Sequence, residues 1–355
     1  MSDLARLLTD AAERFFADAW SKGLRSFDDA HWNRVVNIGL PRMLLPESAG
    51  GADAKWQDVQ GVFHAIGRHS SPIPLADTVL AAGVLAAGGR PIPDAPLGLS
   101  VRCTGDLRHV DGRWRFRGEL AGVALHPASA LIVGVAGRDN RQSAFVVEPG
   151  AARDIQRGQN LAEEPRARLF FEDAEVILID AEDVFIEHLL DQAALLRCAQ
   201  ISGALLATLE LSLDYASNRK QFGRPIGQFQ SVRQALALLA EEYAAVDAAC
   251  SGAFVAADCG SFAFEIACAK LRANEAIGVC TAIAHQVHGA IGFTRDFALR
   301  HFTQRLLSWR TEYGNDTYWA QRLGTAVVTR GAANFWSDLT ARGDAAACAR
   351  PPKRI

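Results

Sequence analysis

The chain has 355 residues, of which 49% are hydrophobic and 22% charged, so its composition excludes a disordered protein and leaves room for two or three domains. Its 37 Lys and Arg residues against 40 Asp and Glu residues give a net charge of −3. This balance excludes a strongly basic protein, and we expect no nucleic-acid partner.

Cysteine and histidine spacing predicts neither a disulfide framework nor a metal site. The seven cysteines form no CxxC pair, and several lie in apolar runs, which indicates reduced, buried thiols. The nine histidines include no HExxH or other metal-ligand spacing. The charged N-terminus lacks a signal-peptide core, and no uncharged stretch reaches the length of a membrane span. We therefore expect a cytoplasmic protein without a metal ion or a membrane span.

Residues 1–90 have the periodicity of helices. The first helix is marked by an apolar stripe of Leu4, Leu7, Leu8, Ala11, Phe15 and Ala19. A second helix is expected to start near Asp28 and Asp29, whose carboxylates suit a helix N-terminus. Two glycines and a proline break the period over 46–52, and helices are expected again over 53–69 and 75–87.

The segment 97–180 changes to short strands. Residues 113–117 alternate polar and aromatic side chains, and the preceding Asp111-Gly112 pair is a hairpin-turn signal. Further strands are expected over 130–136, 143–147, 168–171 and 176–179. Because no helical pattern separates them, they fit a small antiparallel sandwich or barrel and not a βαβ fold.

From residue 184 the pattern is helical almost to the end. Long helices over about 185–217, 226–258 and 261–290, joined by short connections, describe an antiparallel bundle. The predicted fold class is therefore α+β. It comprises an N-terminal helical domain (1–92), a small antiparallel β domain (93–183), a C-terminal four-helix-type bundle (184–345) and a loose tail (346–355).

The segment 219–230, RKQFGRPIGQFQ, carries the most informative chemistry. Gly223 and Pro225 break a long helix just before another begins, and cations lie beside the free NH groups of the new helix. Such a group can hold a diphosphate, and Phe222 could stack on a purine ring. On chemistry alone, a helix connection with solvated charges is the simpler interpretation, because such turns are common.

This segment resembles the acyl-CoA dehydrogenase family, in which an RxQFGxPIxxFQ string joins two long helices. Residues 39–51, GLPRMLLPESAGG, look like the family's G-hydrophobic-PEEYGG loop. Residues 286–293, QVHGAIGF, look like its Q-hydrophobic-hGGxGF loop. The order of helices, β domain and bundle also matches, so the resemblance covers nearly the whole chain.

The resemblance implies an FAD cofactor and a set of residues that bind it. Arg219 takes the place of the arginine that contacts the FAD pyrophosphate of a neighbouring subunit, and Gln221 and Phe222 lie where the family contacts the adenosine. The second loop, acting across a dimer, adds Gln286, Gly289 and His288. A buried polar pair that caps a helix is the alternative for Gln286 and His288.

Two departures from the family pattern concern the flavin ring and the catalytic base. The segments 98–105 and 119–124 replace the family's flavin-lining TEPxxGSD and W-[ILV]-[TS] strings. The family's base is a Glu in a YEGT string, and alignment of the glycines puts Tyr313 at that position, with Glu312 one residue early. Glu312 is therefore the candidate base, with a solvated Glu at a helix end as the alternative, and Asp191 is the reserve candidate on the first bundle helix.

The resemblance implies FAD-dependent α,β-dehydrogenation of an acyl-CoA thioester, with electrons leaving to an electron-transfer flavoprotein. It also implies an oligomer, either a homo-oligomer or a heteromer with a related subunit. The alternative, which both departures favour, is a non-catalytic partner subunit that completes the FAD site of a related chain. A flavin monooxygenase or an acyl-CoA-binding protein of the same fold is a third interpretation.

Overall fold

The computed structural model describes residues 2–101, 103–138, 141–179, 188–260 and 262–341. The chain divides into two compact units, each assembled from segments far apart in the sequence. The bundle unit contains the described residues of 2–23, 56–71 and 194–341. The sheet unit contains those of 24–55 and 72–193. The three-domain division by sequence order stays a prediction, and the predicted tail lies outside the described residues.

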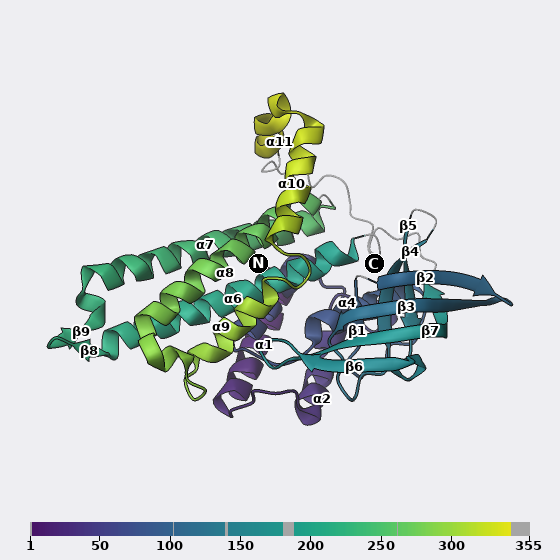
Figure 1. The fold of residues 1–355 in the computed structure, drawn as a ribbon, viewed down its shortest axis with the longest axis horizontal. Helices are drawn as coiled ribbons and strands as arrows, with labels where there is room; N and C mark the ends of the chain where they lie inside the picture. The colour runs from purple at the N-terminus through teal and green to yellow at the C-terminus, as the bar shows by residue number, and fades with distance from the viewer. Residues whose placement is uncertain (1, 102, 139–140, 180–187, 261, 342–355) are drawn as a thin grey trace. The chain divides into compact units, whose positions relative to one another are not determined.

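The bundle unit is built from three long helices, α6 (Leu189–Asn218), α7 (Gln230–Asp258) and α8 (Ala263–His288), which run side by side in Figure 1. The shorter helices are α1 (Asp3–Ser21), α3 (Trp56–Arg68), α9 (Leu299–Trp309), α10 (Asp316–Arg330) and α11 (Phe335–Ala341). Close packing of α3 on α6 requires glycine, because a Cβ at Gly67 would overlap the backbone carbonyl of Gln200.

Helix α1 begins where the sequence predicts, but its buried face is different. Ser2 caps the helix by accepting a hydrogen bond from the Ala5 amide at 2.9 Å. The buried residues are Ala5, Leu8, Ala12, Phe16 and Ala19, while Leu7 is exposed. Two helical stripes one residue apart both contain apolar residues, and packing on the neighbouring α3 selects one of them.

The sheet unit begins with helices α2 (Asp29–Asn37) and α4 (Leu75–Ala87), both close to their predicted bounds. The side chain of Asp28 caps α2 by accepting from the His31 amide at 2.7 Å. A short 3-10 turn at Glu47–Ala49 lies in the predicted loop 46–52, and another at Leu40–Arg42 precedes that loop. Helix α4 is buried along most of its length, and it contacts β1, β4 and β7 of the sheet.

Seven strands form one sheet in the order β1-β4-β5-β7-β3-β2, with β6 also paired to β7. They are β1 (Gly98–Ser100), β2 (Cys103–Val110), β3 (Arg113–Val123), β4 (Ile132–Arg138), β5 (Arg141–Val147), β6 (Asp154–Gln159) and β7 (Pro165–Ile179). Asp111 and Gly112 form the predicted hairpin turn, with φ of 51° and 77°. The core of this unit is a cluster of apolar side chains from the strands of the sheet, including Phe116, Leu120, Phe145 and Leu169.

The α+β fold class is confirmed, with three local differences. One strand pair, β1 with β4, is parallel, whereas an antiparallel domain was predicted. The two strands predicted over 168–171 and 176–179 are parts of the single strand β7, which is long enough to pair with β5, β3 and β6. The prediction of reduced thiols is wrong for Cys259, which takes part in a disulfide, while Cys103, Cys198, Cys250, Cys268 and Cys280 are free.

Two described helices are apolar and long enough to pass a test for membrane spans, Leu189–Asn218 and Ala263–Phe293. In the first, 83% of the apolar window is buried inside the protein, and in the second 44%. Core helices of soluble proteins pass the same test, so the absence of a membrane span stays a prediction. No group of three or more metal-ligating side chains occurs among the described residues.

Candidate functional site

The predicted diphosphate segment forms a small hairpin between α6 and α7, at one end of the long helices in Figure 1. Strand β8 (Lys220–Gln221) pairs with β9 (Arg224–Pro225), and Phe222 and Gly223 make the turn with φ of 52° and 81°. A positive φ at both turn positions matches the twist of a two-residue hairpin. The Phe222 side chain is 92% exposed. An aromatic ring held out in water by a tight turn is available to a planar ligand.

The hairpin also carries unpaired positive charge. Arg219, Lys220 and Arg224 are exposed, and none of them has an ion pair in the described part of the chain. The guanidinium of Arg224 lies over the ring of Phe229, 4.3 Å from its centroid. Three cations without carboxylate partners make this end of the bundle attractive to an anion.

The second predicted loop follows α8 as a 3-10 turn, η5 (Gly289–Phe293). Gln286 and Gly289 are exposed. Gly289 has φ 64° and ψ −147°, a conformation that favours glycine, and a Cβ there would meet open space. Its backbone can therefore be approached closely by a ligand.

His288 does not share this exposure. Its Nδ1 lies 2.8 Å from the Ala284 carbonyl oxygen, and its ring stacks on Tyr215 with centroids 4.6 Å apart. Burial lowers the pKa of His288, which favours the neutral ring. The structure thus places His288 inside the bundle, where it packs the loop against α6.

The hairpin and the loop lie at the same end of the bundle unit. Ala216 from α6, Leu236 from α7 and Val287 from α8 form one buried cluster, with Tyr215, Ile226, Val232 and Ile283 packed against it. Of these, Ala216 lies close to Arg219 in the sequence, and Val287 follows Gln286 directly. The cations, the exposed aromatic ring and the open glycine turn thus lie at one end of the bundle unit, and their chemistry suits the diphosphate and adenosine parts of a dinucleotide.

The segments that replace the family's flavin-lining strings provide no comparable surface. Residues 98–100 form β1, which is buried and paired with β4. Residues 119–123 of the second segment belong to β3, in which Glu119 and Leu120 pair with both β2 and β7. The described residues therefore fit the adenosine end of FAD but show no groups from these strands that would enclose its ring.

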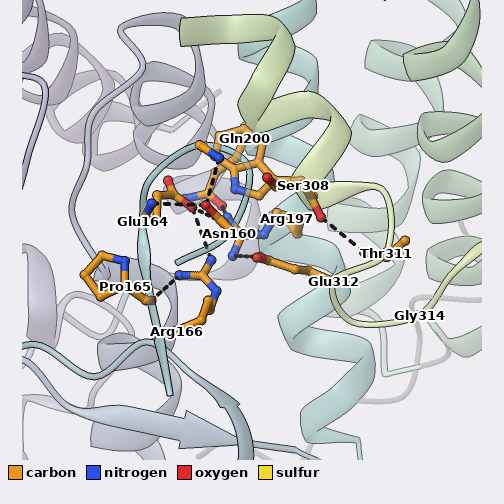
Figure 2. Close-up of polar contacts among 12 residues, drawn as sticks. Asn160, Glu164, Pro165, Arg166, Arg197, Gln200, Ser308, Thr311, Glu312 and Gly314 are labelled. Atoms are coloured by element: carbon orange, nitrogen blue, oxygen red, sulfur yellow. Dashed lines mark hydrogen bonds and ion pairs between the residues drawn. The ribbon is translucent and has the colours of Figure 1, made fainter. Parts of the chain in front are cut away.

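The candidate base Glu312 lies in the turn between α9 and α10. Its carboxylate is ion-paired with Arg197 of α6, with Nη2 and Oε2 2.8 Å apart. Figure 2 shows Arg197 between Glu312 and Gln200, whose Oε1 accepts from Nη1 at 2.6 Å. The side chains of Arg197 and Glu312 are only 7% and 19% exposed. The guanidinium also lies over Trp309 and Tyr313, 4.9 and 5.4 Å from the ring centroids. The carboxylate is therefore engaged by a buried cation.

The backbone of this turn has positive φ angles, and its carbonyl groups accept several side-chain hydrogen bonds. Tyr313 and Gly314 have φ of 56° and 107°, and the Trp319 indole donates to the Tyr313 carbonyl at 3.2 Å. The ammonium of Lys270 donates to the carbonyls of Trp309 and Gly314 at 3.2 and 3.3 Å. Side chains from α8 and α10 thereby bind the backbone on both sides of Glu312.

Asp191, the reserve candidate, lies in the first turn of α6, whose residues up to Ala193 are grouped with the sheet unit. It is buried, and its Oδ2 lies 3.2 Å from Nδ1 of His188. A carboxylate beside an imidazole at the start of a helix is also a common structural arrangement. Asp191 and Glu312 therefore belong to different units.

Sequence reasoning missed Arg197, Lys270 and Asn274. All three lie within long apolar helices, where a single polar residue has no motif around it. The available signal was a Lys and an Asn four residues apart on the buried face of α8. Four residues is one helical turn, so the two side chains can contact each other.

Comparisons with known proteins agree with this architecture. The family model described as acyl-CoA dehydrogenase, C-terminal domain, matches residues 183–327. The acyl-CoA dehydrogenase IpdE2 of Mycobacterium tuberculosis is 29% identical over 282 residues, which cover 79% of this chain and 81% of that protein.

Two solved structures show the same fold at low sequence identity. The ChsE4-ChsE5 complex from Mycobacterium tuberculosis superimposes with a TM-score of 0.82 at 22% identity, covering 92% of this chain and 97% of the other. PigA with FAD and proline gives a TM-score of 0.82 at 18% identity, covering 93% and 99%. Together with the family match over residues 183–327 and the two motifs at one end of the bundle, these similarities identify the chain as acyl-CoA dehydrogenase-like in sequence and fold.

Proposed function

We propose that this chain is a subunit of a FAD-dependent acyl-CoA dehydrogenase that oxidises the α,β bond of an acyl-CoA thioester. The supporting observation is that exposed Arg219 and the exposed Gln286 and Gly289 lie at the same end of the bundle unit. Arg219 would pair with the diphosphate, Phe222 would stack on the adenine, and Gln221 and Gln286 would donate hydrogen bonds. When bound, FAD supplies the hydride acceptor of the reaction. The structure of PigA with FAD and proline, which has the same fold, supports the same cofactor.

The catalytic base, in this proposal, belongs to a related partner chain. Glu312 is held by Arg197 and is not free to face a substrate, and the flavin-lining strings are absent from the sheet. A heteromer explains why the chain keeps the motifs for the diphosphate and adenosine of FAD while it has lost the flavin-lining strings and the usual position of the base. The solved structure with this fold from Mycobacterium tuberculosis is a complex of ChsE4 with ChsE5, which supports this kind of assembly for the present chain. An electron-transfer flavoprotein is the proposed electron acceptor, as the family resemblance implies.

The second candidate is a dehydrogenase in which this chain supplies its own base. One observation favours it: Glu312 is a partly buried carboxylate within one residue of the family's base position. In that case Glu312→Gln should lower turnover at least about 100-fold in the purified chain. In the partner-subunit proposal, the purified chain shows little turnover, and a related subunit restores it whether residue 312 is Glu or Gln.

The cofactor assignment is tested by FAD titration of the Arg219→Ala variant. Charge-assisted hydrogen bonds contribute roughly 1.5–3 kcal/mol, so the dissociation constant should rise about 10- to 150-fold. Arg14→Ala is the matched control, because Arg14 is an exposed arginine on α1 of the same unit. Equal FAD affinity in both variants, with unchanged helical circular dichroism, would refute the role of Arg219.

A further inference from the structure

Lys270 is a buried cation that binds only uncharged acceptors. Its side chain is fully buried on α8, and its ammonium donates to Asn274 Oδ1 at 2.6 Å and to the carbonyls of Trp309 and Gly314 at 3.2 and 3.3 Å. Three acceptors use all three ammonium protons. In the described part of the chain Lys270 forms no ion pair.

This arrangement is costly, and packing alone does not explain it. Burial lowers the pKa of Lys270 to about 8, because the charged form loses its hydration. A methionine of similar length would fill the same space without that penalty. What a methionine cannot do is bind carbonyl oxygens left open at the end of a helix and in a left-handed turn.

The two carbonyl groups that accept from Lys270 lie before and after Glu312 in the sequence. Trp309 is the last residue of α9, and Gly314 stands two residues after Glu312. Asn274 adds a second bond to the same Gly314 carbonyl, its Nδ2 lying at 3.3 Å. The backbone on both sides of Glu312 is thus tied to one turn of α8, while the side chain in between reaches Arg197 on α6.

We infer that Lys270 and Asn274 are positioning residues, which hold the turn 310–315 so that the Glu312 carboxylate contacts Arg197. This inference deepens the proposed function, because the Arg197–Glu312 pair is what separates this chain from one with a free base. Lys270 and Asn274 touch neither partner of the ion pair through a hydrogen bond; they act through the backbone.

The test is a double-mutant cycle with Lys270→Met and Glu312→Gln, measured as equilibrium unfolding in urea without FAD. Glu312→Gln changes the equilibrium constant of unfolding by some factor in the original chain. If Lys270 positions the turn, that factor should be at least about fivefold smaller in the Lys270→Met background. Additive effects, within about twofold, would overturn the inference. Should Lys270→Met fail to fold, the same cycle with Asn274→Ala decides by the same criterion.

Two controls make the result specific. Glu241→Gln, on the exposed face of α7, should show no coupling to Lys270→Met. FAD affinity of Lys270→Met should stay within about twofold, because Gln286 lies sixteen residues along α8, about 24 Å away. A collapse of FAD affinity would mean that Lys270 supports the whole bundle and does not act as a positioning residue. Since the cycle needs no FAD, a chain that never binds FAD would refute the proposed function and leave this test intact.

Discussion

The two ends of helix α8 use polar residues in opposite ways. Near Gln286 the cations and the aromatic ring are exposed, unpaired and borne on tight turns. Near Lys270 the charged groups are buried, and each is engaged by another part of the bundle unit. The difference indicates that one end is built to receive a ligand from outside, whereas the other is already filled by its own side chains.

The largest expected effect is loss of stability at the buried end in Glu312→Gln. Removing one partner of a buried ion pair leaves a cation in a poorly hydrated site, which costs roughly 3–5 kcal/mol. Urea unfolding measures this loss, and Glu241→Gln, an exposed carboxylate on α7, should change stability by less than about 0.5 kcal/mol. Equal stability of the two variants would show that Arg197 does not depend on Glu312.

Gly314→Ala should destabilise the same end by about 3 kcal/mol or more. Residue 314 has φ of 107°, and an added Cβ would overlap the Trp319 indole, so strain and overpacking act together. Thermal unfolding, followed by the near-ultraviolet circular dichroism of the tryptophans, measures the resulting loss of stability. Normal stability in this variant would contradict the tight contact between the turn and α10.

The stability of the chain should also depend on pH through Lys270. The folded pKa is about 8 against an ordinary value of 10.5, so between these values the unfolded chain holds a proton that the folded chain lacks. Stability therefore rises with pH across this window, by up to about 3 kcal/mol. Arg197, Glu312, Asp316 and Cys198 are the charged or titratable groups facing Lys270.

The measurement compares the original chain with Lys270→Met, because cysteines and tyrosines titrate in the same range. The stability difference between the two proteins should change in favour of the original chain from pH 8 to 10.5. A constant difference across this range would mean that Lys270 keeps its charge in the folded protein.

The smallest expected effect on stability is at the exposed end, in Gly289→Ala. The conformation of residue 289 strains an alanine by about 1 kcal/mol, but its Cβ would meet open space. FAD affinity should fall in the same variant, since the added methyl group occupies the approach to the backbone. A loss of stability as large as that of Gly314→Ala would remove the contrast between the two ends.

Local patterns predicted much of the fold. The caps at Asp28, the hairpin at Asp111-Gly112 and the bounds of α4 depend on neighbouring residues, so the sequence contains their causes. The same holds for the exposed hairpin around Phe222, where a turn, cations and an aromatic ring are contiguous. Its chemistry could therefore be inferred before its position in the bundle was known.

Tertiary structure decided which side chains are paired. The buried face of α1, the parallel pairing of β1 with β4 and the merging of two predicted strands into β7 all depend on contacts between distant segments. The same is true of Glu312, whose partner Arg197 is more than a hundred residues away on another helix. A sequence by itself shows that a carboxylate is present near the expected position. Only the packing of α6, α8 and α9 determines that this carboxylate meets a buried guanidinium, because burial and charge pairing depend on distances in space and not along the chain.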